Sequence, residues 1–539
     1  MNVVVLGGSG VFGSLLAELL VRDGHRVWIA GRNARRGRQI ANRLGSSWLT
    51  VDRDGDLTPL SGADPDAIVD AAGPFQEYGD DAYRVARYAI GIGAHYLDLS
   101  DATDFTAEIS TLDQAAREAG VFVLSGASSV PGLSSSVVKE LADGLDQIEV
   151  IDTAILPGNR APRGRSVIES IVAGVGRPVQ VRRGGRWIIE TGWSMRREFD
   201  LAAGLKRVGY LVDVPDLTLF PHFFRARSVI FRAGLELTVM NRFLALLSGA
   251  RRFVRLPIGR SGVSFLLLLS KFLRPFGTDR GGMQVSVTGR VSNEAVRRIW
   301  DLVAKAGDGP YIPGAVVRAI LRDPLQIGTG ARPCLGEVPL PKIESALSDL
   351  RVRTSRNTHP APAMFQTILG GDWNNLPDHT KALHQVHDRE VFSGRAQVTR
   401  GAKPLARLTA WLFRFPPAGE DVPITVTKTR TMTGEIWQRE FAGRTFRSVL
   451  SPAPQTGAFR ERFGLFTFEM GLPIRDGSIE MPVVKGSFLG VPVPRFLLPK
   501  SVTREFVADG RFNFDVALSA PLGCGLIVRY RGWLEPVSD

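Results

Sequence analysis

The chain has 539 residues, of which 44% are hydrophobic and 22% charged, a composition ordinary for folded globular proteins. Its length predicts about three domains at roughly 100–200 residues each. The two cysteines form no CxxC pair, which argues against a disulfide framework and a zinc site. The net charge of +13 favours anionic partners such as phosphorylated cofactors or acidic lipid. Because no nucleic-acid-binding motif accompanies this charge, we expect no nucleic-acid partner.

The first residues and the cysteine usage predict a cytoplasmic protein. Met1 and Asn2 lead directly into the apolar run Val3–Leu6, without the basic segment that begins a secretory signal. No window reaches the ~18 consecutive apolar residues of a membrane span. Two cysteines far apart in the sequence fit a reducing compartment.

Residues 1–130 alternate short apolar runs with helix-like segments. The apolar runs predict strands at Val3–Leu6, Arg26–Ala30, Ser47–Val51, Ala67–Ala71, His95–Leu99 and Val121–Leu124. Helices are predicted at Val11–Arg22, Asp81–Ile92 and Leu112–Ala119. Strands that alternate with helices of this length form βαβ units and a parallel sheet. We therefore predict an α/β fold here, a doubly wound Rossmann domain over residues 1–130.

A glycine-rich loop follows the first predicted strand and opens the first predicted helix. Its residues are Gly8, Ser9, Gly10, Val11, Phe12 and Gly13, a G-x-G-x-x-G motif. Here Gly8 allows the tight turn, Gly10 lets a pyrophosphate approach the backbone, and Gly13 permits close helix–strand packing. The phosphates would bind at the helix N-terminus, where free N–H groups favour negative charge. A glycine-rich structural turn is the alternative, and the strand–loop–helix context favours the dinucleotide site.

The end of the second predicted strand indicates which dinucleotide binds. An NAD site carries an acidic residue there, which bonds the ribose 2′-hydroxyl. This chain has Arg32 and Asn33 instead, with Arg35 and Arg36 close behind. A guanidinium can hold a 2′-phosphate through paired, charge-assisted hydrogen bonds. We therefore favour NADP over NAD. At least one of Arg35 and Arg36 is expected only to form the solvated start of a helix, a role less expected of Arg32.

Two further positions belong to the predicted cofactor site. Asp52 ends the third predicted strand, where it either accepts a hydrogen bond from the adenine amino group or is an ordinary turn residue. Ala72, Gly73 and Pro74 follow the fourth strand. Small residues there let the nicotinamide ribose pass close to the backbone at the carboxyl edge of the sheet.

Residues 131–353 have a looser pattern, which predicts a second, α+β domain for substrate binding or dimerisation. Strands are expected at Val150–Leu156 and Met283–Arg290, with a hairpin at Val179–Glu190. Apolar helices are expected at Asn241–Leu247 and Val263–Leu273.

The last part of the chain predicts a separate domain of mainly antiparallel β structure over residues 363–539. Residues 354–362 are polar and contain proline, which is a linker composition. Beyond them, strands punctuated by glycine and proline are expected at Gly394–Val398, Val422–Lys428, Gly434–Phe441, Thr445–Leu450, Phe463–Glu469, Ser478–Val484 and Arg511–Leu518.

Residues 241–276 combine apolar runs with seven basic residues between Arg242 and Arg274. A helix with an apolar face and basic flanks can lie on an anionic membrane surface. The alternatives are a buried core helix or a contact between subunits of a homodimer. The segment therefore predicts either a peripheral membrane location or an internal packing role.

Several strings beyond the glycine loop resemble the saccharopine dehydrogenase NAD(P)-binding family and its oxidoreductase relatives of unknown substrate. They are VDAAGPFQEYG at 69–79, GAHYLDLS at 93–100, VPGLSS at 130–135, GDGPYIP at 307–313 and GARPC at 330–334. The last third resembles a bacterial domain of unknown function fused to such oxidoreductases, through FPPAG at 415–419, EIWQREFAGR at 435–444, ERFG at 461–464 and YRGWL at 530–534. The resemblance implies a Rossmann fold and a nicotinamide cofactor, and it implies no particular substrate.

Hydride transfer needs a group near the nicotinamide that gives or takes a proton. The Tyr-x-x-x-Lys pair of short-chain dehydrogenases is missing. Tyr78, Asp98 and Ser100 are candidates because they lie near the predicted carboxyl edge. Structural roles are favoured over catalytic ones, with Tyr78 packing against the cofactor and Asp98 anchoring a loop. No catalytic residue is therefore assigned.

Three histidines, His379, His384 and His387, lie close together in the sequence. His384 and His387 have the spacing of a metal-binding helix face, but a third ligand is missing. We favour the interpretation that these histidines are polar helix residues beside an arginine-rich surface, and we predict no metal site.

Two functions remain open on these grounds. The first is an NADP-dependent oxidoreductase that acts on a hydrophobic or lipid-like small molecule. The second is a non-catalytic module that binds a dinucleotide and uses its C-terminal domain to hold a lipid or a partner.

Overall fold

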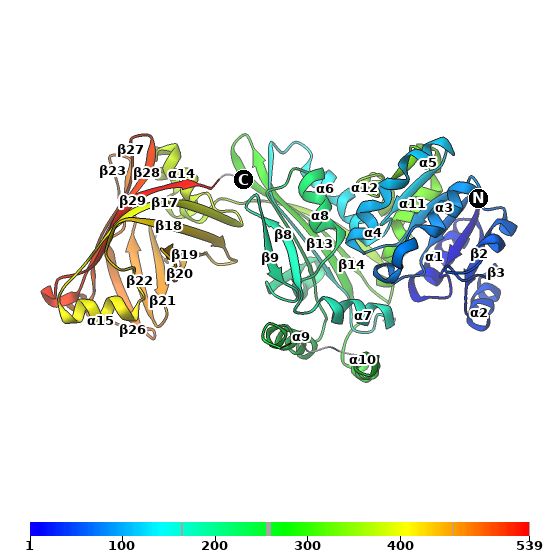
Figure 1. Ribbon diagram of the computed structural model, residues 1–539, viewed down its shortest axis with the longest axis horizontal. Helices are drawn as coiled ribbons and strands as arrows, with labels where there is room; N and C mark the ends of the chain where they lie inside the picture. Colours follow the sequence, from blue (N-terminus) through cyan, green and yellow to red (C-terminus); the bar gives the residue numbers. More distant parts are fainter. Residues whose placement is uncertain (163–164, 255–259, 456, 538–539) are drawn as a thin grey trace. The chain divides into compact units, whose positions relative to one another are not determined.

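The computed structural model describes residues 1–162, 165–254, 260–455 and 457–537, and it divides into two compact units (Figure 1). Unit 1 contains residues 1–182, 187–291 and 297–359. Unit 2 contains residues 183–186, 292–296 and 360–539. Each unit has its own sheets and its own hydrophobic cores.

Unit 1 begins with a seven-stranded sheet, in the order β15-β6-β5-β4-β1-β2-β3. Its strands are β1 (Asn2–Leu6), β2 (Arg26–Gly31), β3 (Ser47–Thr50), β4 (Ala67–Asp70), β5 (His95–Asp98), β6 (Phe122–Ser125) and β15 (Gly330–Pro333). Every adjacent pair is parallel. This confirms the predicted Rossmann-type sheet and six of its strands. The seventh strand, β15, comes from a segment that the sequence had placed in the second domain.

Both faces of this sheet are buried, as a doubly wound fold requires. Along β1, Val3 and Val5 point into one core, whereas Val4 and Leu6 point into the other. Helices α1 (Val11–Arg22), α2 (Ala34–Leu44), α3 (Arg84–Gly91), α4 (Thr103–Glu108) and α5 (Asp113–Glu118) accompany the strands. The first of these has the bounds that the sequence predicted.

A second sheet of unit 1 has the strand order β10-β11-β12-β7-β13-β14-β16. Its strands are β7 (Gln147–Leu156), β10 (Arg197–Leu201), β11 (Leu205–Leu211), β12 (Ser228–Ala233), β13 (Gly281–Val291), β14 (Glu294–Ala304) and β16 (Val352–Pro360). The predicted hairpin is present as β8 (Pro178–Arg183) and β9 (Arg186–Thr191). Helices α6 (Ser134–Ala142), α7 (Arg165–Gly174), α8 (Pro215–Phe223), α9 (Thr238–Arg251), α10 (Arg260–Leu273), α11 (Ala315–Arg322) and α12 (Leu340–Ser345) complete the unit.

The prediction of a linker at residues 354–362 was wrong, because most of this segment is a strand. Residues 352–360 form β16, which pairs with β14 at the edge of the second sheet. Most of its side chains are exposed, because an edge strand presents polar residues to water. This explains why its composition resembles that of a linker. A shortened chain that ends at Arg353 would therefore remove most of a strand of unit 1.

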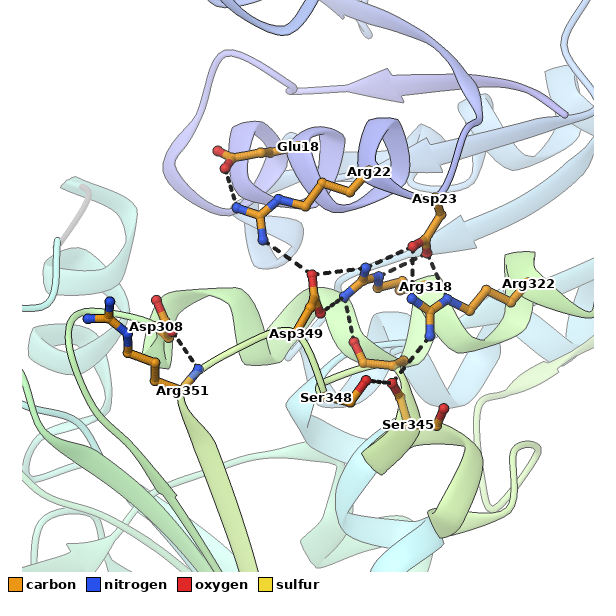
Figure 2. A network of polar contacts seen from close by, with 11 residues as sticks. Glu18, Arg22, Asp23, Asp308, Arg318, Arg322, Ser345, Ser348, Asp349 and Arg351 are labelled. Carbon is orange, nitrogen blue, oxygen red and sulfur yellow. Dashed lines mark hydrogen bonds and ion pairs between the residues drawn. The ribbon is translucent and has the colours of Figure 1, made fainter.

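A buried arginine joins the first helix of unit 1 to residues more than 290 positions away (Figure 2). Arg318 on α11 donates from Nε to Asp23 Oδ2 at 2.9 Å and from Nη1 to Asp349 Oδ1 at 2.6 Å. Arg322, one helical turn further, also binds Asp23. Burial alone would raise the pKa of Asp23, but hydrogen bonds from Arg322 and Arg318 hold this pKa well below its usual range.

Unit 2 is built on a thirteen-stranded antiparallel sheet, in the order β23-β24-β27-β28-β29-β17-β18-β19-β20-β21-β22-β25-β26. This confirms the predicted mainly antiparallel β structure. The long strands are β17 (Arg389–Arg400), β18 (Gly419–Arg430), β19 (Glu435–Phe441), β20 (Arg444–Pro452), β27 (Lys500–Ala508), β28 (Arg511–Ser519) and β29 (Leu526–Pro536). The shorter ones are β21 (Ala458–Phe463), β22 (Phe466–Gly471), β23 (Ile474–Arg475), β24 (Ser478–Glu480), β25 (Val483–Phe488) and β26 (Val491–Pro492).

Three helices accompany this sheet: α13 (Met364–Leu369), α14 (Asp378–His384) and α15 (Pro404–Leu412). Residues from β18, β19, β21, β22, β27, β28 and β29 line one common cavity, so the sheet curves around it. Among the residues that the structure describes, no helix of either unit is long and apolar enough to cross a bilayer.

Candidate functional site

The glycine loop lies between β1 and α1, at the carboxyl edge of the parallel sheet. Gly7 adopts a left-handed φ of 76°, and a Cβ atom there would lie 2.5 Å from Ala72 Cα. A Cβ atom on Gly13 would lie 2.4 Å from the carbonyl oxygen of Gly7. The loop and helix therefore approach each other as closely as a pyrophosphate site requires. The left-handed turn is at Gly7, whereas the sequence analysis had assigned the tight turn to Gly8.

The N-terminus of α1 is available to an anion. Its N-cap is Gly10, whose carbonyl oxygen accepts a hydrogen bond from Ser14 N at 3.2 Å. Glycine has no side chain, and no side chain caps this helix. Ser9, Val11 and Phe12 beside it are half-buried. The unsatisfied N–H groups of a first helical turn and the helix dipole favour a phosphate at such a position.

The segment after β2 lies next to this loop. A Cβ atom on Gly31 would lie 3.7 Å from Ser9 Oγ, and Arg32 follows immediately with an exposed side chain. Asn33 has a structural role, because its Oδ1 accepts a hydrogen bond from Arg36 N at 3.1 Å and caps α2. Of the basic residues here, Arg32 is thus the one that directly follows the strand.

The other predicted cofactor residues divide into two groups. Ala72 contacts the glycine loop, as described, and Gly73 and Pro74 continue along the same edge. Asp52 is exposed, and its Oδ1 accepts a hydrogen bond from Asp54 N at 3.3 Å. This contact is that of a turn residue, which is one of its two predicted roles.

Two fully buried carboxyl groups occupy the ends of neighbouring strands, at Asp70 of β4 and Asp98 of β5. Burial raises the pKa of Asp98 to about 7, although Gly126 N, Ser100 N and Ser125 Oγ all donate to its Oδ1. These contacts fix the loop after β6, so the structure supports the anchoring role of Asp98.

Burial likewise raises the pKa of Asp70 to about 6, against a hydrogen bond from Ala72 N. Asp70 was not among the predicted site residues, although it ends a wholly apolar run, which is a signal for a buried polar group with a specific partner.

Tyr78 packs within this polar cluster. Its hydroxyl donates to Asp70 Oδ1 at 3.3 Å, and the guanidinium of Arg53 lies 3.3 Å from its ring centroid. Burial, and then the charge of Asp70, raise the pKa of Tyr78, so its hydroxyl remains protonated. Arg53 is only 8% exposed and was missed from the sequence. Its positive charge lowers the pKa of Asp70 and so opposes part of the effect of burial on that carboxyl group.

Ser100 is also held in internal contacts. Its Oγ accepts hydrogen bonds from Ala102 N at 3.1 Å and from Thr106 Oγ1 at 3.0 Å. All three candidates for proton transfer therefore have structural partners.

His384 of unit 2 was wrongly predicted to lie on a polar surface. It is fully buried, and its Nε2 lies 2.7 Å from Glu505 Oε2. Burial, and then the charge of Lys428, lower the pKa of His384 and favour its neutral form. Within the described residues no three His, Cys, Asp or Glu side chains are grouped as a metal site.

Comparison with protein families agrees with this geometry. Residues 3–124 match the family model of the saccharopine dehydrogenase NADP binding domain. The N-terminal part of the chain is a saccharopine dehydrogenase-type dinucleotide-binding domain. Residues 376–534 match a domain of unknown function, DUF4166. Both matches confirm the resemblance seen in the sequence, and the first supports an NAD(P)-dependent oxidoreductase.

The solved structures that match share little sequence with this chain. Saccharopine dehydrogenase (L-Glu forming) from Saccharomyces cerevisiae is 16% identical over 66% of this chain and 99% of that protein, with a TM-score of 0.48. Homospermidine synthase from Legionella pneumophila, in complex with NAD, is 11% identical over 67% and 92%, with a TM-score of 0.45. A probable dehydrogenase from Thermotoga maritima is 10% identical over 66% and 98%, with a TM-score of 0.33. No curated protein matches the chain.

Proposed function

We propose that the protein is an NADP(H)-dependent oxidoreductase that acts on a hydrophobic, lipid-like substrate. The assignment of NADP(H) as cofactor rests on the glycine loop at the start of α1 and on Arg32, which directly follows β2. The observation that favours a hydrophobic substrate is an apolar pocket of about 200 Å³ between α7, α9 and α10. Ile168, Val172 and Leu244 are among its lining residues.

The choice of cofactor is tested at Arg32. NADP(H) should bind more tightly than NAD(H), because the guanidinium can pair with the 2′-phosphate. Arg32→Ala should narrow this preference by roughly 1–3 kcal/mol, the size of a lost hydrogen bond to a charged group. Calorimetric titration of both cofactors measures the difference. Arg38→Ala, on the exposed face of α2, is the matched control and should keep the full preference. Equal wild-type affinities for the two cofactors would contradict the assignment.

An exposed apolar face supports contact with lipid. On α10 it consists of Phe265, Leu268, Leu269 and Phe272, and on α9 of Val239, Phe243 and Leu246. The α10 residues recur at helical spacing, so they form one stripe that faces outward. Contiguous exposed apolar area of this kind marks an interaction surface. We infer a peripheral contact with an anionic membrane, to which the basic residues of segment 241–276 add attraction.

The structure changes which of these basic residues can meet lipid. Arg251 donates from Nη1 to the carbonyl oxygens of Val172 and Val175, each at 2.7 Å, and so holds α7 against α9. Arg255 lies outside the described residues. Arg252 is exposed and is a better site for charge reversal than Arg251.

Vesicle binding is expected to require both charge and apolar area. The protein should sediment with acidic vesicles, bind neutral ones weakly, and dissociate at high ionic strength. Leu268→Ser with Phe272→Ser should lower partitioning at least about tenfold, because two large apolar side chains no longer enter the interface. Leu325→Ser replaces a still more exposed leucine elsewhere in unit 1 and should have no effect. If acidic and neutral vesicles bind equally, the face is instead a subunit contact, and the double variant should change the oligomeric state.

The second function is a non-catalytic dinucleotide-binding module, and it is favoured by the internal partners of Tyr78, Asp98 and Ser100. The two functions differ in whether the protein oxidises NADPH catalytically. Oxidation of NADPH by the pure protein, in the presence of an extract of cellular lipid, supports the oxidoreductase. Tight NADPH binding without oxidation of any extract supports the module.

A further inference from the structure

The curved sheet of unit 2 lines a partly open cavity of about 150 Å³ whose walls are mostly apolar. Phe415, Ile424, Phe514 and Leu518 are among the side chains that line it. An apolar cavity of this size is large enough for a ring-sized ligand such as benzene. The side chains alternate along each strand, so the cavity side of β18 presents Ile424, Val426 and Lys428 in succession.

Lys428 therefore places an amino group in an otherwise apolar wall. Its side chain is 3% exposed, and its Nζ donates to the carbonyl oxygen of Leu383 at 2.8 Å. A longer contact of 3.5 Å joins Nζ to His384 Nδ1. An ammonium has three donors, so one N–H remains. The face of the Trp437 ring lies beside it, with 3.8 Å between Nζ and the ring centroid.

The charged neighbours of Lys428 are engaged with other groups. Arg439 on β19 pairs with Glu461 at 3.2 Å, and Glu505 on β27 bonds His384 at 2.7 Å. Glu435 accepts a hydrogen bond from Trp437 Nε1 at 2.8 Å. Across the described part of the chain, Lys428 forms no ion pair with a carboxylate.

We propose that unit 2 binds a small apolar carboxylate in this cavity, with the carboxylate on Lys428 and the apolar body directed along β18 toward Phe415. The proposal does not depend on the oxidoreductase function of unit 1. Glu505 and Glu435 act on the buried ammonium by their charge, but neither carboxylate contacts it directly. A ligand carboxylate supplies that direct ion pair and an acceptor for the remaining N–H. The apolar walls then exclude water from the pair and select an apolar body.

Binding of a carboxylate to Lys428 should also change the number of protons that the protein holds. Burial lowers the pKa of Lys428 to about 8, and the opposing charges of Glu505 and Glu435 do not restore it. His384, Glu505, Glu435 and Arg439 are the titratable and charged groups that face it. A bound carboxylate raises the pKa of Lys428, so binding at pH 8.5 should take up protons from the buffer, and binding at pH 6.5 should take up far fewer.

The test uses the full-length protein with octanoate, 1-octanol and octylamine as probes of equal length. Titration calorimetry should show octanoate binding at least tenfold more tightly than octanol, with octylamine weakest. Repeating the octanoate titration at pH 8.5 in two buffers of different ionisation enthalpy measures proton uptake. Equal binding of octanoate and octanol, or no proton uptake at pH 8.5, would overturn the proposal.

A lysine variant locates the binding, since unit 1 also has an apolar pocket. Lys428→Met keeps the length and apolar stem of the side chain, so it should abolish the preference for octanoate while octanol still binds. Lys500→Met, at an exposed position on β27, is the matched control and should behave as wild type. If the Lys428→Met protein does not fold, the proton uptake of the wild type decides the question alone. A folded Lys428→Met protein that retains the full preference for octanoate would place the site elsewhere.

Discussion

Replacing Arg318 with methionine is expected to lower the free energy of unfolding of unit 1 by about 3–5 kcal/mol. The guanidinium is 2% exposed and donates to Asp23, to Asp349 and to the carbonyl oxygen of Ala346 (Figure 2). Methionine fills much of the same volume but leaves the 10%-exposed carboxylate of Asp23 with one cationic partner fewer. The loss arises because a buried ion pair is broken on one side only.

Arg322→Met is the matched control for this change. Arg322 binds the same carboxylate, but its side chain is 35% exposed, so water can replace it. Its removal should cost no more than about 1 kcal/mol. Hydrogen exchange of peptides from β1 and α1 reports the unfolding of unit 1 separately from unit 2. Losses below 1 kcal/mol in both variants would show that the network does not hold α1 to α11.

The parallel sheet could be predicted from the sequence because its signals are local. Each strand is a short apolar run, and each run ends at glycine or at polar residues that begin a helix. The bounds of α1 were predicted correctly because Gly10 and the 3.6-residue spacing of its buried leucines mark the helix. The strand β15 could not be found in this way. Four residues, Gly330–Pro333, carry no strand pattern, and only pairing with β6, two hundred residues earlier, makes them a strand.

Buried polar groups could not be paired from the sequence, because their partners lie far along the chain. In the sequence Arg53 resembles a surface residue, and only the fold shows that it contacts Tyr78 and Ala82. His384 has helical spacing to His387, and only the packing of α14 against β27 brings Glu505 to it. The cofactor loop was predictable because it is one continuous segment, whereas the lysine site of unit 2 is assembled from α14, β18, β19 and β27.

Asp98 should show a pH-dependent contribution to stability that an asparagine removes. Burial raises its folded-state pKa to about 7 from an ordinary value of 3.8. Between these values the folded protein holds a proton that the unfolded chain has lost, so this group's stabilisation is complete below about pH 4 and is lost as the pH rises through 7. The full change is on the order of 4 kcal/mol.

Asp98→Asn isolates this effect because all three donors bind one oxygen. Gly126 N, Ser100 N and Ser125 Oγ donate to Oδ1, and Oδ2 has no hydrogen-bond partner among the described residues. The amide of asparagine keeps the acceptor and resembles the protonated acid in shape and charge. The two proteins should therefore be equally stable below about pH 4. As the pH rises from there to about 7, the variant should become the more stable one by about 1.4 kcal/mol per pH unit, and the gap should then level off.

Asp98→Ala removes the acceptor and leaves three buried donors without a partner. It should lower the free energy of unfolding by about 3 kcal/mol or more at pH 5. Urea denaturation at pH 5, 6, 7 and 8 compares the wild type with both variants. If the stability of Asp98→Asn stays parallel to that of the wild type across this range, Asp98 is ionised in the folded protein at pH 5. Its charge would then be held by the three donors, and Asp70 alone would account for proton uptake at this edge of the sheet, because burial raises the pKa of Asp70 to about 6.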